Sequence, residues 1–364
     1  MADSVFPTSL SEEVWRNEFF FEMVRDMGFS RDIGESENDI IQMVDDLESK
    51  AGVTVNIPLL HSLAGDGVEG DDTLEDNEEQ AASFNYEVAT TQKRNAIRVG
   101  KAEQKKSGID LIKAYRKALK MWAMEDLDDL IVEKMLSANV DGTTAYASCT
   151  EAQKDAWLLA QNPTPATNAR VLFGALTSNA VADHSTGLGN LDSTADDLSP
   201  ALLALEKRLC QGCSPKMRPV KVDGGEWWKA YAGPYAFRDL ETNMATTHQN
   251  AAPRSLEDNP LFKPGDLVSR GVMVHEVQKI GVITGVGAGG IDVTTVPFCG
   301  AQAIVIASKD RPKPIDQDRD YGNKRGIGIE VDRGVRKPFF GRTTDGSDLV
   351  QHGMGTLYVS GVAD

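Results

Sequence analysis

The segment whose spacing most resembles a ligand-binding motif is 285–290, which reads GVGAGG. The spacing fits a dinucleotide-binding loop, and residues 281–284 (GVIT) before it are strand-like. Such a loop needs a helix directly after it, because the amides of the helix N-terminus bind the pyrophosphate. Residues 291–297 (IDVTTVP) are instead β-branched and end in proline. The pattern favours a glycine turn between two strands, with an NAD-dependent oxidoreductase as the alternative hypothesis.

A second candidate for chemistry is the pair Cys210 and Cys213, which has the spacing of half a zinc site or of a redox pair. A zinc site needs two more ligands, but His184 and His248 are isolated and no second cysteine pair exists. A redox pair usually opens a helix, whereas this one closes an expected helix. We therefore expect incidental thiols, and keep a small metal-binding module as a third hypothesis. No catalytic residue, cofactor site or metal site is predicted.

The overall charge restricts the possible partners. The 364 residues include 38 Lys and Arg against 55 Asp and Glu, a net charge of -17. This balance argues against a surface that neutralises nucleic-acid phosphates or binds anionic lipid. The four cysteines and the absence of a secretory signal pattern favour a reducing cytoplasm. No apolar stretch approaches the 18 residues typical of a membrane span, so no membrane partner is expected.

Residues 9–27 predict an amphipathic helix. Ser9 and Glu12 fit a capping box, and Trp15, Phe19 and Met23 recur every four residues. The helix packs either on its own domain or, as an arm, on a neighbouring molecule, because the turn-rich segment 28–38 separates it from the rest. The sequence leaves both possibilities open.

Two strands and a long acidic loop are predicted next. Residues 53–59 and 84–88 alternate between apolar and polar side chains, which indicates half-buried strands. The 22 residues 61–82 between them hold eight acids and no Lys or Arg. Like charges oppose a folded-back loop, so we predict a hairpin that reaches outward, towards a basic surface on another chain. The acids are Asp66, Glu69, Asp71, Asp72, Glu75, Asp76, Glu78 and Glu79.

The longest helical pattern covers residues 107–138, with Ser107 and Asp110 as start signals. Its basic residues lie in the first half and its acidic residues in the second, which opposes the helix dipole. We infer that partners outside the helix offset this arrangement. The basic group is Lys113, Arg116, Lys117 and Lys120, and the acidic group is Glu125, Asp126, Asp128 and Asp129.

The second half of the sequence predicts an α+β fold with mostly short strands. Residues 183–197 look like a polar loop, and Ser199 with Pro200 starts a helix that runs to about residue 209. Trp227 and Trp228 lie on opposite faces of a strand, one in the core and the other in the core or at an intersubunit surface. Strands are expected at 220–222, 227–231, 272–274, 291–296, 303–307, 327–331 and 357–359.

In this order the parts resemble the Hong Kong 97-type fold of tailed-bacteriophage major capsid proteins, and the residues resemble its N-four-like phage branch. The resemblance runs from residue 38 over nearly the whole chain. Its phrases are NDIIQ at 38–42, LESKAG at 47–52, VNIPL at 55–59, GDGVEGD at 65–71, LEDNEE at 74–79, NPLF at 259–262, GAQA at 300–303 and DYGN at 320–323. The parts that it implies are an N-terminal arm (1–52), an E-loop hairpin (53–98), a P-domain with a spine helix (99–198), an A-domain (199–315) and strands returning to the P-domain (316–364).

The resemblance implies a structural major capsid protein, not an enzyme, that self-assembles into hexamers and pentamers of an icosahedral head. It implies a virion location, with assembly in the host bacterial cytoplasm. The implied partners are many copies of the same chain, a portal, possible scaffold or decoration proteins, and double-stranded DNA enclosed without sequence-specific binding. Our candidates for contacts between copies are Trp15, Phe19, Asp66, Glu69, Asp71, Asp72, Glu75, Asp76, Lys113, Arg116, Lys117, Lys120, Glu125 and Asp129.

Overall fold

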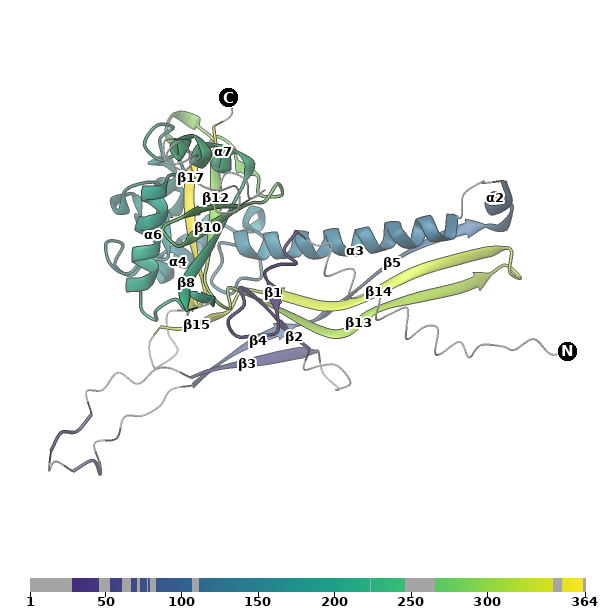
Figure 1. Ribbon diagram of the computed structural model, residues 1–364, viewed down its shortest axis with the longest axis horizontal. Helices are drawn as coiled ribbons and strands as arrows, with labels where there is room; N and C mark the ends of the chain where they lie inside the picture. The colour runs from purple at the N-terminus through teal and green to yellow at the C-terminus, as the bar shows by residue number, and fades with distance from the viewer. Residues whose placement is uncertain are drawn as a thin grey trace. The chain divides into compact units, whose positions relative to one another are not determined.

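The computed structural model describes residues 28–45, 53–60, 67–70, 73–76, 78, 83–106, 111–222, 224–245, 266–342 and 349–362 (Figure 1). The helix predicted at 9–27 lies outside these residues. Contacts divide the chain into two units. Unit 1 contains residues 1–55, 88–135 and 304–336, and unit 2 contains residues 56–87, 136–303 and 337–364. Each unit is thus assembled from three separate stretches of sequence.

Among the described residues, unit 1 is a five-stranded sheet with one long helix beside it. The strand order is β1-β2-β13-β14-β5, and the long β13 and β14 form an antiparallel hairpin at its centre. The short helix α2 (Lys101–Lys106) follows β5 directly. The strands are β1 (Ile33–Gly34), β2 (Ile41–Val44), β5 (Thr91–Gly100), β13 (Ile304–Arg319) and β14 (Lys324–Arg336).

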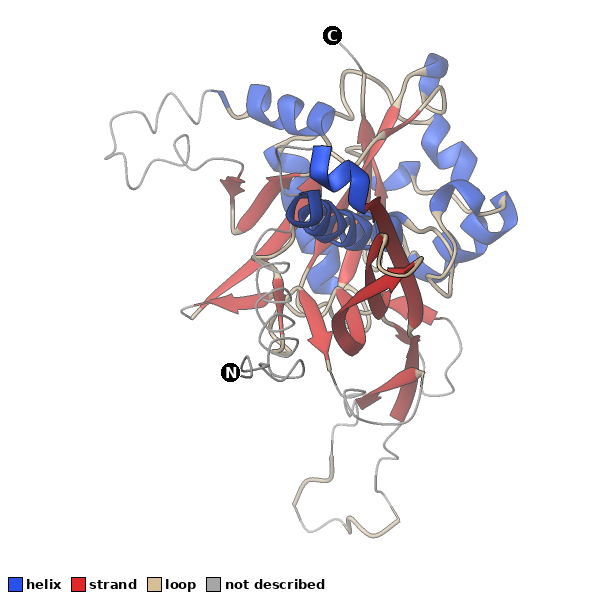
Figure 2. Cartoon of the chain, turned by 90° about the vertical axis from the view of Figure 1, so that its right-hand side faces the viewer, coloured by secondary structure: helices blue, strands red, loops and turns tan. Residues whose placement is uncertain are grey.

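The long helix α3 (Leu111–Leu136) packs along one face of this sheet, as Figure 2 shows nearly end-on. Its buried Leu119 and Ala123 contact Ile327, Ile329 and Val331, which alternate along β14. Side chains four residues apart share a helix face, and alternate side chains share a sheet face, so the two periods meet in one apolar layer. The helix predicted from residue 107 is confirmed from residue 111 onward, because residues 107–110 are not described.

In the described part of unit 2, a mixed sheet has the strand order β6-β17-β12-β8-β10-β9. β11 pairs with β12 at one side, and β7 pairs with β8. The strands are β6 (Val171–Phe173), β7 (Val220–Val222), β8 (Gly225–Ala232), β9 (Asp266–Ser269), β10 (Val272–Glu276), β11 (Val282–Ile283), β12 (Val293–Cys299) and β17 (Met354–Ser360).

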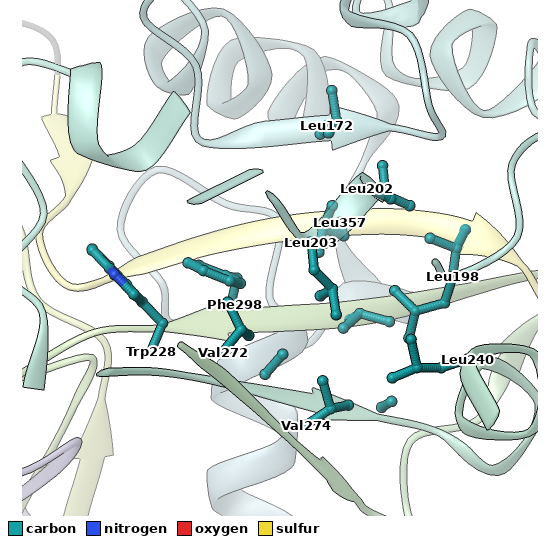
Figure 3. Close-up of a cluster of buried hydrophobic side chains, with 14 of the residues drawn as sticks. Leu172, Leu198, Leu202, Leu203, Trp228, Leu240, Val272, Val274, Phe298 and Leu357 are labelled. Carbon is teal, nitrogen blue, oxygen red and sulfur yellow. The ribbon is translucent and has the colours of Figure 1, made fainter. Parts of the chain in front are cut away.

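Helices of unit 2 cover this sheet. Leu202 and Leu203 of α6 and Leu240 of α7 pack on Phe298 and Leu357 of the strands (Figure 3). On the next position of β17, Tyr358 points to the opposite face and stacks on Phe173. The helices are α4 (Glu151–Gln161), α5 (His184–Gly189), α6 (Pro200–Gly212) and α7 (Pro234–Asn243), with 3-10 turns η1 (Tyr146–Ser148), η2 (Thr177–Asn179) and η4 (Ala288–Gly290). No helix in the described part of the chain is long and apolar enough to cross a membrane.

The described residues also form two separate two-stranded sheets. β3 (Thr54–Leu60) and β4 (Ser83–Ala89) pair as predicted, with Val55, Tyr86 and Val88 buried. β15 (Phe339–Gly341) pairs with β16 (Leu349–Gln351), and Tyr86 makes an edge contact with Phe340. The alternating pattern therefore located both strands of the hairpin.

The structure confirms one further sequence prediction and corrects two others. The helix after Ser199 is confirmed: the Ser199 hydroxyl accepts a hydrogen bond from the Leu202 amide, and α6 ends at Gly212. The prediction of a polar loop at 183–197 was wrong in part, because this segment contains the helix α5, which Asp183 caps. The expectation of mostly short strands was wrong for β13 and β14, which have 16 and 13 residues. Their charged side chains obscure the alternation, since one face of the sheet is exposed.

Candidate assembly surfaces

The basic half of α3 is joined to the sheet of unit 1 by an ion-pair cluster. The guanidinium of Arg116 lies 2.8 Å from the Asp316 carboxylate of β13, and Arg325 of β14 lies 3.2 Å from the same carboxylate. All three side chains are about one-third to one-half exposed, so the pairs contribute about 0–1 kcal/mol each. Part of the unfavourable charge order of the helix is thus offset within the chain itself.

The acidic half of α3 is held by a more buried cluster. Asp126 accepts a hydrogen bond at 2.7 Å from Lys93 of β5 and another from Arg333 of β14. Arg333 is 5% exposed and also donates to the Ala123 carbonyl. Burial raises the pKa of Asp126, but the hydrogen bonds from Lys93 and Arg333 outweigh it, so the pKa lies below its usual range. Charged Asp126 therefore links α3 to β5 and β14 of the sheet through its hydrogen bonds with Lys93 and Arg333.

The other helix candidates lie wholly or partly at the surface. Lys113, Lys117, Glu125 and Asp129 are exposed, and Lys120 is half-buried. Exposed charges of both signs along one helix can meet complementary charges on a second molecule. Contacts of these residues with another copy stay a prediction.

The acidic hairpin is described only in part. Glu69, Glu75 and Asp76 are exposed, as is Leu74, an apolar side chain among them at 62% exposure. The candidates Trp15, Phe19, Asp66, Asp71 and Asp72 lie outside the described residues. The described acids are accessible to a basic partner, and their role as contacts stays a prediction.

A trough of about 360 Å³ lies on the sheet of unit 1, at strands β5, β13 and β14. Ile97, Ile327 and Ile329 point to α3, so the alternate residues on these strands point to the opposite, open face. On that face Gly326 and Gly328 form the floor. The walls are Arg94 and Arg98 of β5 and Ile315, Gln317 and Arg319 of β13.

The walls of the trough carry unsatisfied positive charge. Among the described residues, neither Arg94 nor Arg98 forms a hydrogen bond or ion pair through its guanidinium group. Within the described ranges, the Arg319 guanidinium donates only to Gln317 of its own strand, at 3.2 Å. Ile315 is 45% exposed beside them. The trough therefore offers cationic walls, one apolar side chain and an open floor.

The turn between β13 and β14 presents an aromatic side chain. Asp320, Tyr321 and Gly322 all have left-handed backbone angles, with φ of 55°, 49° and 81°. The Asn323 amide donates to the Asp320 carbonyl at 2.9 Å, and the Asn323 carbonyl accepts from the Lys101 amide at 2.8 Å. Tyr321 has a relative exposure of 111%. Sequence reasoning used DYGN only as part of a resemblance, although an aromatic residue within a turn signal could have indicated an exposed anchor.

The glycine segment 285–290 lacks the surroundings of a dinucleotide site. β11 before it pairs antiparallel with β12 after it, and only the single turn η4 lies between them. The Gly285 amide donates to the Asp292 carboxylate at 2.9 Å, so the loop closes on itself. Without a following helix no row of amides is available for a pyrophosphate. The glycines form the expected turn between strands.

The cysteine pair is enclosed in the core of unit 2. Both thiols are free and buried at the end of α6, and Cys213 Sγ lies 2.9 Å from the Cys210 carbonyl. Cys210 Sγ lies 3.4 Å from Oε1 of Glu206, and burial raises the pKa of Glu206 to about 8. No group of three His, Cys, Asp or Glu side chains suited to a metal ion occurs within the described ranges. The pair is therefore placed as a packed helix end.

Comparisons with known proteins agree with one another. A family model described as "Phage capsid protein" matches residues 8–364. The major capsid protein of Pseudomonas phage KPP25 is 25% identical over 374 residues, covering 97% of this chain and 96% of that protein. A chain of the cyanophage Pam1 capsid asymmetric unit is 31% identical, with a TM-score of 0.82 and full coverage of both chains. A chain of the capsid of Ralstonia phage GP4 is 22% identical, with a TM-score of 0.71 and coverage of 93% and 92%.

Proposed function

Because the chain belongs to the phage capsid protein family, we propose that it is a major capsid protein, many copies of which form an icosahedral phage head. The observation that carries the proposal is the full-length likeness, at 31% identity and a TM-score of 0.82, to a chain of an assembled capsid. The fold agrees with the Hong Kong 97-type fold that the sequence resembles.

The physical properties of the single chain support assembly. Leu60 and Leu74 of the β3–β4 hairpin are 70% and 62% exposed, and Tyr321 is fully exposed. A protein that works alone gains little from such side chains, whereas burial against a neighbour stabilises by about 25 cal/mol per Å². The acidic hairpin and the exposed charges of α3 add contacts that are weak one by one. Weak contacts let wrongly placed copies dissociate.

The finer proposals extend the same function. The copies form hexamers and pentamers, occupy the virion capsid and assemble in the host bacterial cytoplasm, with a portal and possible scaffold or decoration proteins as partners. The shell encloses double-stranded DNA without sequence-specific binding, which a net charge of -17 supports. The capsid role is structural, not enzymatic. The linear parts predicted from sequence, from the arm at 1–52 to the return strands at 316–364, are proposed as the family's domains in this chain.

Purified full-length protein tests the proposal by light scattering and negative-stain electron microscopy over a concentration series. We expect ring-shaped oligomers or closed shells, whose proportion rises with protein concentration. A folded protein that stays monomeric at every concentration, with and without a coexpressed scaffold protein, would contradict the proposal.

A further inference from the structure

Tyr321 lies at the tip of the β13–β14 hairpin, where its side chain is accessible to a partner molecule. Residues other than glycine pay a steric cost for a left-handed backbone, and both Asp320 and Tyr321 adopt one. The turn is nevertheless fixed, because Asn323 bonds to Asp320 at its amide and its side chain, and to Lys101 at its carbonyl. An aromatic ring at a strained, fixed and fully exposed position contributes nothing to the fold of its own chain. Such strain often marks a functional site.

The trough has the chemistry to receive an aromatic side chain. A Cβ added at Gly326 would meet nothing closer than 3.4 Å, and the same holds at Gly328, so the floor is open to an entering group. Guanidinium groups stack on aromatic faces, and those of Arg94 and Arg98 form no ion pair in the described part of the chain. The volume of about 360 Å³ has room for a phenol ring.

Charge and connectivity make a second copy the fitting occupant. Asp318 and Asp320 flank Tyr321 at the tip, with side-chain exposures of 67% and 53%. Asp318 lies 4.0 Å from Arg325 and Asp320 lies 3.8 Å from Lys324. Exposed pairs at such distances are weak, so both carboxylates can exchange these bases for the guanidinium groups of the trough walls. Tyr321 does not occupy its own trough, since the turn that fixes its backbone leaves the ring fully exposed. One chain thus carries both a protruding group and a complementary recess.

We propose that the tip of the β13–β14 hairpin is an assembly contact, in which Tyr321 of one copy enters the trough on the sheet of a second copy. The ring lies over Gly326 and Gly328 between the guanidinium groups of Arg94 and Arg98. The contact uses a different surface on each copy, so where it is not reciprocated it is heterologous and joins copies in a ring or a shell. The inference rests on the proposed capsid function.

The first test compares wild type with Tyr321→Gly and Tyr321→Phe. Glycine relieves the backbone, so we expect Tyr321→Gly to keep or raise the melting temperature of the unassembled protein but to lower the yield of shells at least tenfold. Phenylalanine keeps the ring and should retain most of the yield. Shell formation by Tyr321→Gly at the wild-type yield would overturn the inference while leaving the capsid function intact, whereas failure of wild type to assemble would contradict the capsid function itself.

The second test identifies the receiving surface by a disulfide between copies. Two single variants, Tyr321→Cys and Ala96→Cys, are mixed before assembly and oxidised afterwards; Ala96 lies in the trough, and the four native cysteines are buried. We expect a covalent dimer only in the mixture. The matched control replaces Ala96→Cys by Gln92→Cys, on the same face but about 13 Å along β5. Absence of the Tyr321–Ala96 crosslink in assembled particles, or an Ala96→Cys crosslink to Glu75→Cys of the acidic hairpin instead, would overturn the inference.

Discussion

Replacing Asp126 by Asn should destabilise unit 1 by about 3 kcal/mol, the lower end of the cost of breaking a buried ion pair. The carboxylate is 17% exposed and its partner Arg333 is 5% exposed, so an uncharged amide leaves a buried guanidinium without its counterion. Nε and Nη1 of Arg333 already have no hydrogen-bond partner, which leaves few alternatives. The second partner, Lys93, is 42% exposed and adds about 0–1 kcal/mol.

The assay is urea unfolding of the full-length, unassembled chain, followed by fluorescence and circular dichroism. At an m-value of about 3 kcal/mol per M, the transition that reports unit 1 should move down by about 1 M urea. The matched control is Asp316→Asn, which removes an exposed carboxylate from the same helix–sheet contact and should cost less than about 1 kcal/mol. Adding Arg333→Met to Asp126→Asn should recover much of the loss, because no buried charge is then unpaired.

Equal midpoints for Asp126→Asn and Asp316→Asn would refute this reasoning. They would mean that the buried cluster is no stronger than the exposed one. An unchanged loss in the double variant with Arg333→Met would likewise show that the unpaired guanidinium is not the cause.

Three other outcomes are expected. The double variant Glu75→Lys and Asp76→Lys should weaken both assembly and its salt dependence, measured by light scattering. The control Glu241→Lys, which changes an exposed acid on α7, should have neither effect. Equal effects of the two changes would contradict a specific contact by the acidic hairpin. Burial raises the pKa of Glu206 to about 8, so between pH 4.5 and 8 the folded state binds more protons than the unfolded state, and stability falls as pH rises through that window. The variant Glu206→Gln should abolish this fall when urea midpoints are compared at pH 5 and pH 8. An unchanged fall in the variant would refute the assignment to Glu206. Burial lowers the pKa of His352 to about 4, so below pH 6.5 the folded state binds fewer protons than the unfolded state, and stability falls on acidification to pH 4. The variant His352→Gln should reduce this loss of stability, measured by thermal melts. Equal acid sensitivity of the variant and the wild type would contradict the prediction.

The elements with regular periods could be predicted from sequence. The alternation at 53–59 and 84–88 gave β3 and β4, and the four-residue spacing of Leu119 and Ala123 with later apolar residues gave α3. Ser199 before Pro200 gave the start of α6, because a hydroxyl at the cap and a proline at the first turn satisfy the local backbone. In each case local chemistry alone determines the element.

The long central hairpin could not be predicted in the same way. β13 holds two prolines and many charges, which argue against a strand. The irregular pairing between Ser308 and Lys313 contains Pro312. Beyond Ala307 the strand no longer pairs with β2, so its outer edge needs no amide donors. Its partner β14 was predicted only at 327–331, where Ile327, Ile329 and Val331 alternate, because charged residues and glycines conceal the rest of the strand. Long-range pairing, rather than local pattern, decides these strands.

The candidate contacts also divide into those visible as local sequence pattern and those that depend on long-range pairing. The acidic hairpin and the charge order of α3 were visible as sequence, whereas the trough depends on bringing Arg94, Ile315 and Gly326 together from three strands. The ion pair of Arg116 with Asp316 also shows why charge order alone overstates what is left for neighbours. Residues 200 positions apart are joined only by the fold.

The scattered origin of each sheet sets the order of events during translation. β13 and β14 at the centre of unit 1 are synthesised more than 200 residues after β5, and β17, which lies between β6 and β12, comes later still. Neither sheet can close while these strands are inside the ribosome, because such distant pairings form last. A nascent chain therefore has no complete sheet with which to bind other copies translated from the same messenger RNA. A prematurely terminated chain lacks these strands, so we expect it to be degraded by proteases and not to enter a growing particle.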